Sequence, residues 1–126
     1  MKALKNVLVI NGITSGATGL LLIVFAKFFA EIFAATEVMP FVGVGVFLVL
    51  FAVLVLSQGL KVSPREKMVL LISVLDISWV VGSVAIVVLQ LFSLSSVGYV
   101  LIAAVAAWVS LMAILQLKGV RRMSPS

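Results

Sequence analysis

The sequence predicts an all-α fold, an integral membrane four-helix bundle with up-down-up-down topology. Hydrophobic residues make up 64% of the chain and charged residues only 10%, with a mean hydropathy of +1.40. Soluble domains average about 45–50% apolar residues, so we expect the exterior of this protein to face lipid. Two further observations, four long apolar runs and the placement of the basic residues between them, support the same fold class.

The four apolar runs extend over about residues 7–29, 40–60, 68–92 and 97–117. A hydrocarbon core of about 30 Å needs about 20 helical residues, and each run reaches that length. The 126 residues therefore predict a single four-span transmembrane domain over 1–126. The first run exceeds the ~7–15 apolar residues of a secretory signal, which favours a membrane anchor.

Two of the connections carry their own signals. Ser63, Pro64 and Glu66 predict that the third helix begins near Pro64, with Ser63 as N-cap and Glu66 bonding back to it. Between the first two runs, apolar residues recur at helical spacing beside two charged ones. This pattern fits either a short amphipathic turn at the outer interface or a simple extension of the first helix. The residues are Lys27, Phe28, Phe29, Glu31, Ile32 and Phe33.

Nine basic residues predict the orientation in the membrane. Eight of them precede the first span, separate the second from the third, or follow the fourth, and only Lys27 lies on the other side. By the positive-inside rule, both termini and the central loop are expected in the cytoplasm, in a plasma or inner membrane. The eight are Lys2, Lys5, Lys61, Arg65, Lys67, Lys118, Arg121 and Arg122.

The two halves of the sequence resemble each other. Residues 7–11 resemble residues 69–73, and in this register Thr14 matches Asp76; residues 57–61 and 116–119 both contain Gln, Gly and Lys. These matches suggest a parallel duplication of a two-helix hairpin, related by an axis along the membrane normal. Composition alone also makes apolar helices resemble one another, so both interpretations stay open.

Asp76 is the one ionisable residue deep inside a span, and it is the first candidate for a functional site. A carboxylate at such depth costs about 2.5–3.5 kcal/mol on insertion scales, so it should face the bundle interior or a wet cavity, or be protonated. No Lys or Arg lies deep within another span to neutralise it, since Lys27 is two residues from the end of the first. The candidate ligand- or ion-binding set is Asp76, Trp79, Asn11, Thr14, Ser15 and Ser110.

Small residues mark two candidate packing faces. Gly12, Gly16 and Gly19 lie on the first span, and Ala103 and Ala107 lie on the fourth. Small residues four positions apart allow two helix backbones to approach closely in a membrane. For the first span, packing inside the bundle is favoured over a dimer contact, whereas for the fourth the two are balanced.

Two function hypotheses follow, and neither includes catalysis, because the chain has no Cys, no His and no recognisable catalytic or phosphate-binding motif. No metal and no cofactor are expected. The favoured hypothesis is a self-associating or complex-associated helical module, in which Asp76 fixes helix register. The alternative is a proton- or cation-linked transporter of a small hydrophobic or cationic solute that uses Asp76. Expected partners are membrane lipids, whose anionic headgroups the basic clusters could hold, and a second copy or another membrane protein, but no nucleic acid.

Overall fold

The computed structural model describes residues 2–61 and 64–123, and every regular element among them is a helix. The long helices are α1 (Lys2–Val24), α3 (Met39–Gly59), α4 (Glu66–Val88) and α5 (Ser96–Met123). Two short elements, α2 (Ala26–Ile32) and the 3-10 helix η1 (Leu91–Ser93), lie in the connections. All four long helices are long and apolar enough to cross a membrane, which confirms the predicted fold class.

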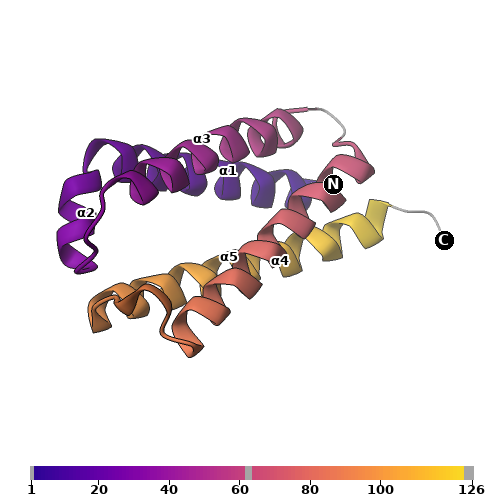
Figure 1. Ribbon diagram of the computed structural model, residues 1–126. Coiled ribbons are helices and arrows are strands. Elements are labelled where there is room, and N and C mark those ends of the chain that lie inside the picture. The colour runs from indigo at the N-terminus through magenta and orange to yellow at the C-terminus, as the bar shows by residue number, and fades with distance from the viewer. Residues whose placement is uncertain (1, 62–63, 124–126) are drawn as a thin grey trace.

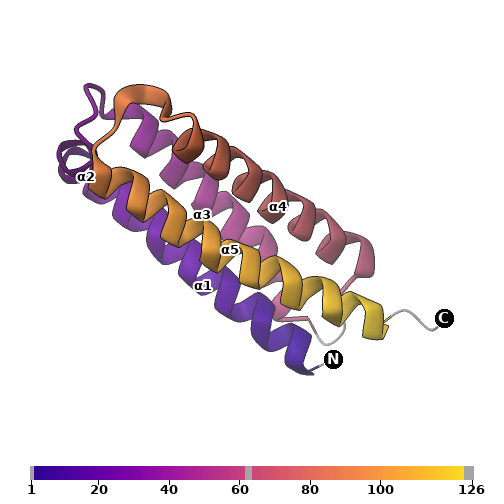
Figure 2. The same cartoon turned by 90° about the horizontal axis from the view of Figure 1, so that it is seen from below.

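The four long helices alternate in direction, so the two ends of the chain lie at the same end of the bundle (Figure 1). α1 packs most extensively against α3, and α4 packs most extensively against α5. α1 also contacts α5, whereas α3 and α4 touch each other little. The molecule therefore consists of two helical hairpins, which diverge in Figure 1 with distance from the chain termini. In Figure 2, seen from below, the hairpin of α4 and α5 lies in front of the hairpin of α1 and α3. This arrangement fits a hairpin duplication, which stays a prediction.

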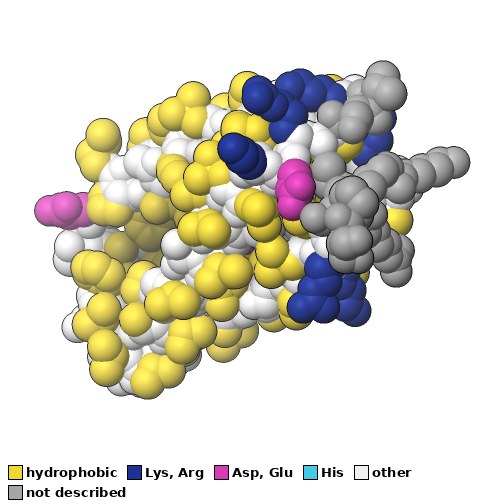
Figure 3. Space-filling model, turned by 90° about the vertical axis from the view of Figure 1, so that its right-hand side faces the viewer, with side chains coloured by type: hydrophobic (Ala, Val, Ile, Leu, Met, Phe, Trp, Pro, Cys, Tyr) yellow, Lys and Arg dark blue, Asp and Glu magenta, His cyan; other side chains and the backbone are white. Residues whose placement is uncertain are grey.

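The outer surface of the bundle is strongly apolar along all four long helices. Large side chains such as Leu50, Val81 and Val100 point outward. In Figure 3, hydrophobic side chains cover most of the visible face, and Lys and Arg gather on one part of it. Such a surface suits lipid as the surrounding medium and supports a multi-pass membrane protein.

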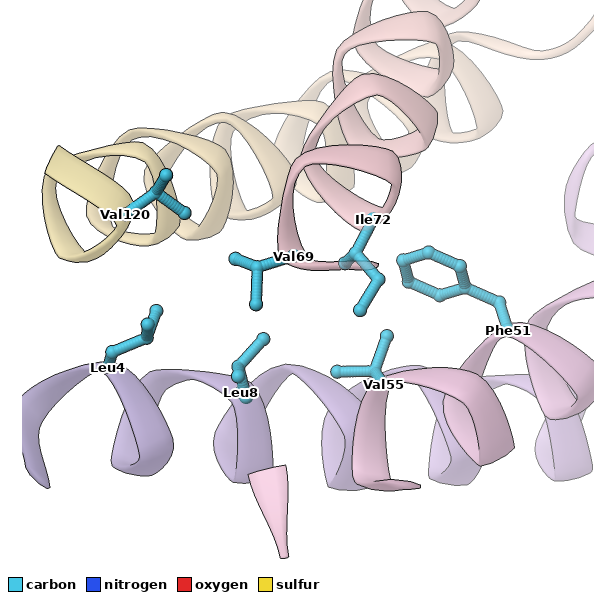
Figure 4. Packing of buried hydrophobic residues seen from close by; sticks show 7 residues of the cluster. All are labelled: Leu4, Leu8, Phe51, Val55, Val69, Ile72 and Val120. Carbon is cyan, nitrogen blue, oxygen red and sulfur yellow. The ribbon is translucent and has the colours of Figure 1, made fainter. Parts of the chain in front are cut away.

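A cluster of seven buried hydrophobic side chains joins the two hairpins near the chain termini (Figure 4). Its members come from the start of α1 and α4 and from the second half of α3 and α5. Since lipid chains are as apolar as these side chains, the stabilisation comes from close packing rather than from removal of the side chains from water. The seven residues are Leu4, Leu8, Phe51, Val55, Val69, Ile72 and Val120.

Glycines bring α1 and α3 into close contact within the first hairpin. A Cβ built on Gly19 would lie 2.7 Å from the carbonyl oxygen of Gly45, and one built on Gly45 would lie 2.7 Å from that of Gly19. Nearer the start of α1, Gly12 faces Leu56 and Gly16 faces Ala52. The structure thus places the glycine face of α1 inside the bundle, where a side chain larger than hydrogen would separate the backbones.

The first predicted span is too long, because the chain turns at Phe25 (φ −109°, ψ 30°) and begins a separate helix, α2. A simple extension of the first helix to Phe29 is therefore wrong. α2 turns away from α1 (Figure 1) and leads to two hydrogen bonds with the segment before α5. The Ser95 N–H donates to the Phe33 carbonyl at 2.9 Å, and the Ser95 hydroxyl donates to the Ile32 carbonyl at 2.7 Å. These bonds connect the hairpins at the end remote from the termini.

The third membrane helix begins at Glu66, two residues after Pro64, which was predicted to be its first helical residue. The predicted N-cap, Ser63, lies outside the described residues. Arg65 is extended (φ −80°, ψ 125°), and no side-chain hydrogen bond caps this helix start. The buried Gln58, at the end of α3, instead accepts the Arg65 N–H through its Oε1 atom at 3.0 Å. This bond from the preceding helix holds Arg65 outside α4, so Glu66 occupies the first helical position rather than the third.

The last connection also differs from the prediction, since α4 ends at Val88 rather than near Phe92. Gln90 and Phe92 have positive φ angles of 48° and 67°, which a continuing right-handed helix does not allow. α5 then runs to Met123, beyond the expected end at residue 117. Polar side chains near residue 117 therefore lie inside the helix rather than at its end.

Candidate functional site

Asp76 lies in the middle of α4 and is only 3% exposed. It follows the first residue of the helix by ten positions, which corresponds to about 15 Å at 1.5 Å per residue. Its carboxylate points into the bundle, where buried polar side chains from α1, α4 and α5 surround it. This position agrees with the expectation that an acid in a span faces the interior.

Two amide side chains donate hydrogen bonds to Asp76. The Asn11 Nδ2 atom, from α1, lies 3.2 Å from Asp76 Oδ2, and the Gln116 Nε2 atom, from α5, lies 3.0 Å from the same oxygen. Asn11 also donates to Gln116 Oε1 at 2.7 Å, which closes a triangle of three side chains. Hydrogen bonds from neutral donors to a charged acceptor contribute about 1.5–3 kcal/mol each.

Two serines complete this polar network. Gln116 Nε2 donates to the Ser73 hydroxyl at 3.2 Å, and the Ser15 hydroxyl donates to Asn11 Oδ1 at 3.1 Å. Helical spacing explains the local placement, because Asn11 and Ser15 are four residues apart on α1 and Ser73 and Asp76 are three apart on α4. Each amide hydrogen and each amide oxygen of Asn11 and Gln116 thus has a partner.

Gln116 is a central member of the network that the sequence analysis missed. The predicted fourth span ends at residue 117, so Gln116 stood at its boundary, where a polar residue is unremarkable. Because α5 continues to Met123, Gln116 lies about 10 Å inside the helix end and is fully buried. The sequence feature that could have identified Gln116 was its match to Gln58 in the suggested repeat. Gln58 is also buried.

A small pocket borders the network on the side of α3. Asp76 and Ser15 are its polar members, and Phe47 and Trp79 stack with ring centroids 6.2 Å apart and planes 7° from parallel. Its empty space of about 250 Å³ includes the open exterior, and the enclosed part has room for about one water-sized group. Trp79 Nε1 is buried and has no hydrogen-bond partner among the described residues. The full lining is Ser15, Phe47, Leu48, Phe51, Leu75, Asp76, Trp79 and Val109.

Two of the candidate binding residues lie outside this network. The Thr14 hydroxyl donates to the Ile10 carbonyl at 2.9 Å and accepts the Trp108 Nε1–H at 3.2 Å on the bundle exterior. The Ser110 hydroxyl donates to the Ala106 carbonyl of its own helix at 2.8 Å. The structure therefore brings together Asp76, Asn11 and Ser15 with Trp79 alongside, and it leaves Thr14 and Ser110 out. Among residues 2–61 and 64–123, no group of three acidic, His or Cys side chains forms a metal-binding cluster.

The small-residue faces of α1 and α5 have different surroundings. The α1 glycines are covered by α3, whereas Ala103 and Ala107 are exposed on α5. Ala106, between them, is 6% exposed and faces the bundle. α5 therefore presents one small exposed side chain on each of two successive turns.

The fold and this site together define a small α-helical membrane protein with a buried polar network between two hairpins. The chain matches no protein-family model, no curated protein and no solved structure. Its function is therefore inferred from the geometry of its own residues.

Proposed function

We propose that this chain is a non-catalytic module of a plasma or inner membrane that associates with a second copy of itself through α5. The closed hydrogen-bond triangle at Asp76 is the observation that carries the non-catalytic role. The carboxylate is bonded to two neutral amides rather than to a nucleophile or a second acid, which suits an interior clamp that fixes the hairpins relative to each other.

The exposed face of α5 supports the association. With Ala103 and Ala107 on successive turns, a second helix could approach closely enough for backbone contact, the geometry typical of membrane helix pairs. The corresponding glycine face of α1 is already occupied by α3. Association with another membrane protein through the same face would use the same contacts.

Cysteine cross-linking tests the association directly, because the chain contains no cysteine. We expect Ala103→Cys to form a disulfide-linked dimer in native membranes under mild oxidation. Val53→Cys, at a residue 63% exposed on α3, is the matched control and should remain monomeric. Adding Ala107→Leu to the Ala103→Cys variant should reduce the dimer fraction about tenfold, since a bulky side chain blocks close approach. Equal cross-linking at positions 103 and 53, or none at 103, would contradict the proposal.

The distribution of charge supports an orientation with both termini in the cytoplasm. Lys5, Lys61, Lys67 and Lys118 lie near the helix ends on the side of the chain termini, and Lys27 lies on α2 at the opposite end. A fluorescent protein that matures only in the cytoplasm should fluoresce when fused after Ser126. The same fusion placed in the connection between α2 and α3 should stay dark, and the reverse pattern would invert the topology.

A second candidate function is the proton- or cation-linked transport of a small hydrophobic or cationic solute. The pocket beside Asp76 favours it, because a polar group within an apolar pocket is the usual arrangement of a ligand site. This function requires that a ligand reach the carboxylate from the membrane.

A further inference from the structure

We propose that the pocket between α3 and α4 binds the ammonium head of an amphiphilic primary amine, with the carboxylate of Asp76 as its counter-ion. The ligand would enter from the lipid, and its hydrocarbon tail would remain in the bilayer. This proposal goes beyond the module function, because it assigns a ligand to a site that association through α5 does not use.

The charge of the site is the first argument. Asp76 is buried in the middle of its span, and both of its hydrogen-bond donors are neutral amides. The nearest basic residue in the sequence, Lys67, lies nine positions away at the start of α4. An acid in a span is usually paired with a positive group, and a positively charged ligand would supply one here.

The arrangement of hydrogen bonds leaves room for such a ligand. Both amide donors reach Oδ2 of Asp76, and no hydrogen bond among the described residues ends on Oδ1. Oδ1 is thus available to accept an N–H from an ammonium group. Binding there would leave the triangle of Asn11, Asp76 and Gln116 intact.

We expect access to the site between α3 and α4, the two consecutive long helices that pack least against each other. Phe47, which is 44% exposed, stands at the outer surface of the bundle and also lines the pocket. Apart from Asp76 and Ser15, the lining is apolar or aromatic. These features favour a ligand that arrives from lipid rather than from water.

The size and the aromatic wall of the pocket restrict the chemical class of the ligand. The enclosed part of the pocket has room for only about one water-sized group, and the rest is open to the exterior. It suits a compact primary ammonium better than a bulky quaternary head. The ring faces of Phe47 and Trp79 can add a cation–π attraction to the Coulomb attraction of the carboxylate.

Trp79 provides the measurement, since the chain has only one other tryptophan, Trp108. In a Trp108→Phe background, the full-length protein would be placed in phosphatidylcholine nanodiscs at neutral pH and titrated with dodecylamine. We expect a saturable change in Trp79 fluorescence. Dodecanol, with the same chain but no charge, should give no saturable change, and empty nanodiscs correct for partitioning into lipid.

Two variants locate the binding. Asp76→Asn retains an oxygen that can accept from both amides but removes the charge, and it should weaken dodecylamine binding at least about tenfold. Phe47→Leu removes one aromatic face without touching the network and should weaken binding by about 3- to 10-fold. Glu37→Gln, at an exposed residue between α2 and α3, is the control and should bind like the parent.

Three results would overturn the proposal. One is equal binding of dodecanol and dodecylamine, and another is unchanged amine affinity in an Asp76→Asn protein with the parental Tm. If Asp76→Asn does not fold, Phe47→Leu decides, and unchanged affinity in that variant would exclude the pocket. Cross-linking at Ala103 is independent of all these outcomes, so failure of the ligand site and failure of the module function can be told apart.

Discussion

Replacing Gln116 with leucine is expected to destabilise the folded protein by about 2–4 kcal/mol. Gln116 bonds to Asn11, Ser73 and Asp76 at once. Its loss leaves an amide N–H of Asn11 and the Ser73 hydroxyl without their partner, and Asp76 keeps only the donor from Asn11. The cost of an unpartnered buried group exceeds the net gain of a formed hydrogen bond, and it is larger still where a charge loses a donor. Thermal and denaturant unfolding of the purified protein in detergent would measure the change.

The matched control is Ser110→Ala on the same helix. Its hydroxyl bonds only to the Ala106 carbonyl of its own helix, so we expect a change within about 0.5 kcal/mol. A triple variant, Asn11→Leu with Asp76→Leu and Gln116→Leu, should be more stable than Gln116→Leu alone, because no polar group of the triangle remains unpaired. A cost for Gln116→Leu no greater than that of Ser110→Ala would show that the network contributes little to stability.

The network also explains how the two hairpins can hold one arrangement in lipid. Within each hairpin, extensive helix packing supplies van der Waals contact, most closely at Gly19 and Gly45. Between the hairpins, apolar side chains can slide against one another at small cost, since lipid satisfies them equally well. Hydrogen bonds from Asn11 on one hairpin to Asp76 and Gln116 on the other have fixed geometry, and they define one relative position.

Hydropathy and length were sufficient to predict the four membrane helices and their alternating topology. Their ends were less predictable, because they depend on contacts between distant residues. The Arg65 N–H is held by Gln58 rather than by the neighbouring Ser63-to-Glu66 motif, and the chain turns at Phe25 within a continuous apolar run. Hydropathy does not distinguish a bent helix from a straight one when both segments are apolar.

The sequence predicted the central residue of the candidate site, but it did not predict all of the residues around it. The rarity of an acid within a span identified Asp76, and Asn11 and Ser15 were both in the predicted binding set. Thr14 shares their depth in the membrane, yet it points toward Trp108 on the outside, because helix rotation depends on tertiary packing. The suggested repeat pairs Thr14 with Asp76, and the structure shows that these two residues have different environments.

Replacing Gly45 with valine is expected to destabilise the first hairpin by about 3 kcal/mol, the upper end of the usual range for overpacking. A Cβ at this position would lie 2.7 Å from the Gly19 carbonyl oxygen and 2.7 Å from Cγ1 of Ile23. The first of these atoms belongs to the backbone, so α1 and α3 must separate to admit the side chain. The free energy of unfolding, determined from the folded fraction in detergent, would measure the effect.

Gly43→Val is the matched control for Gly45→Val, because it makes the same change two residues earlier on α3. Nothing lies within 4 Å of a Cβ built on Gly43, and valine has a higher helix propensity than glycine. We therefore expect Gly43→Val to change the free energy of unfolding by no more than about 0.5 kcal/mol. Similar losses in both variants would mean that valine in α3 is itself unfavourable and that the Gly19–Gly45 approach is not a tight contact. If only Gly45→Val is destabilised, then close backbone packing stabilises the first hairpin. This contribution is separate from that of the polar network, which joins the two hairpins.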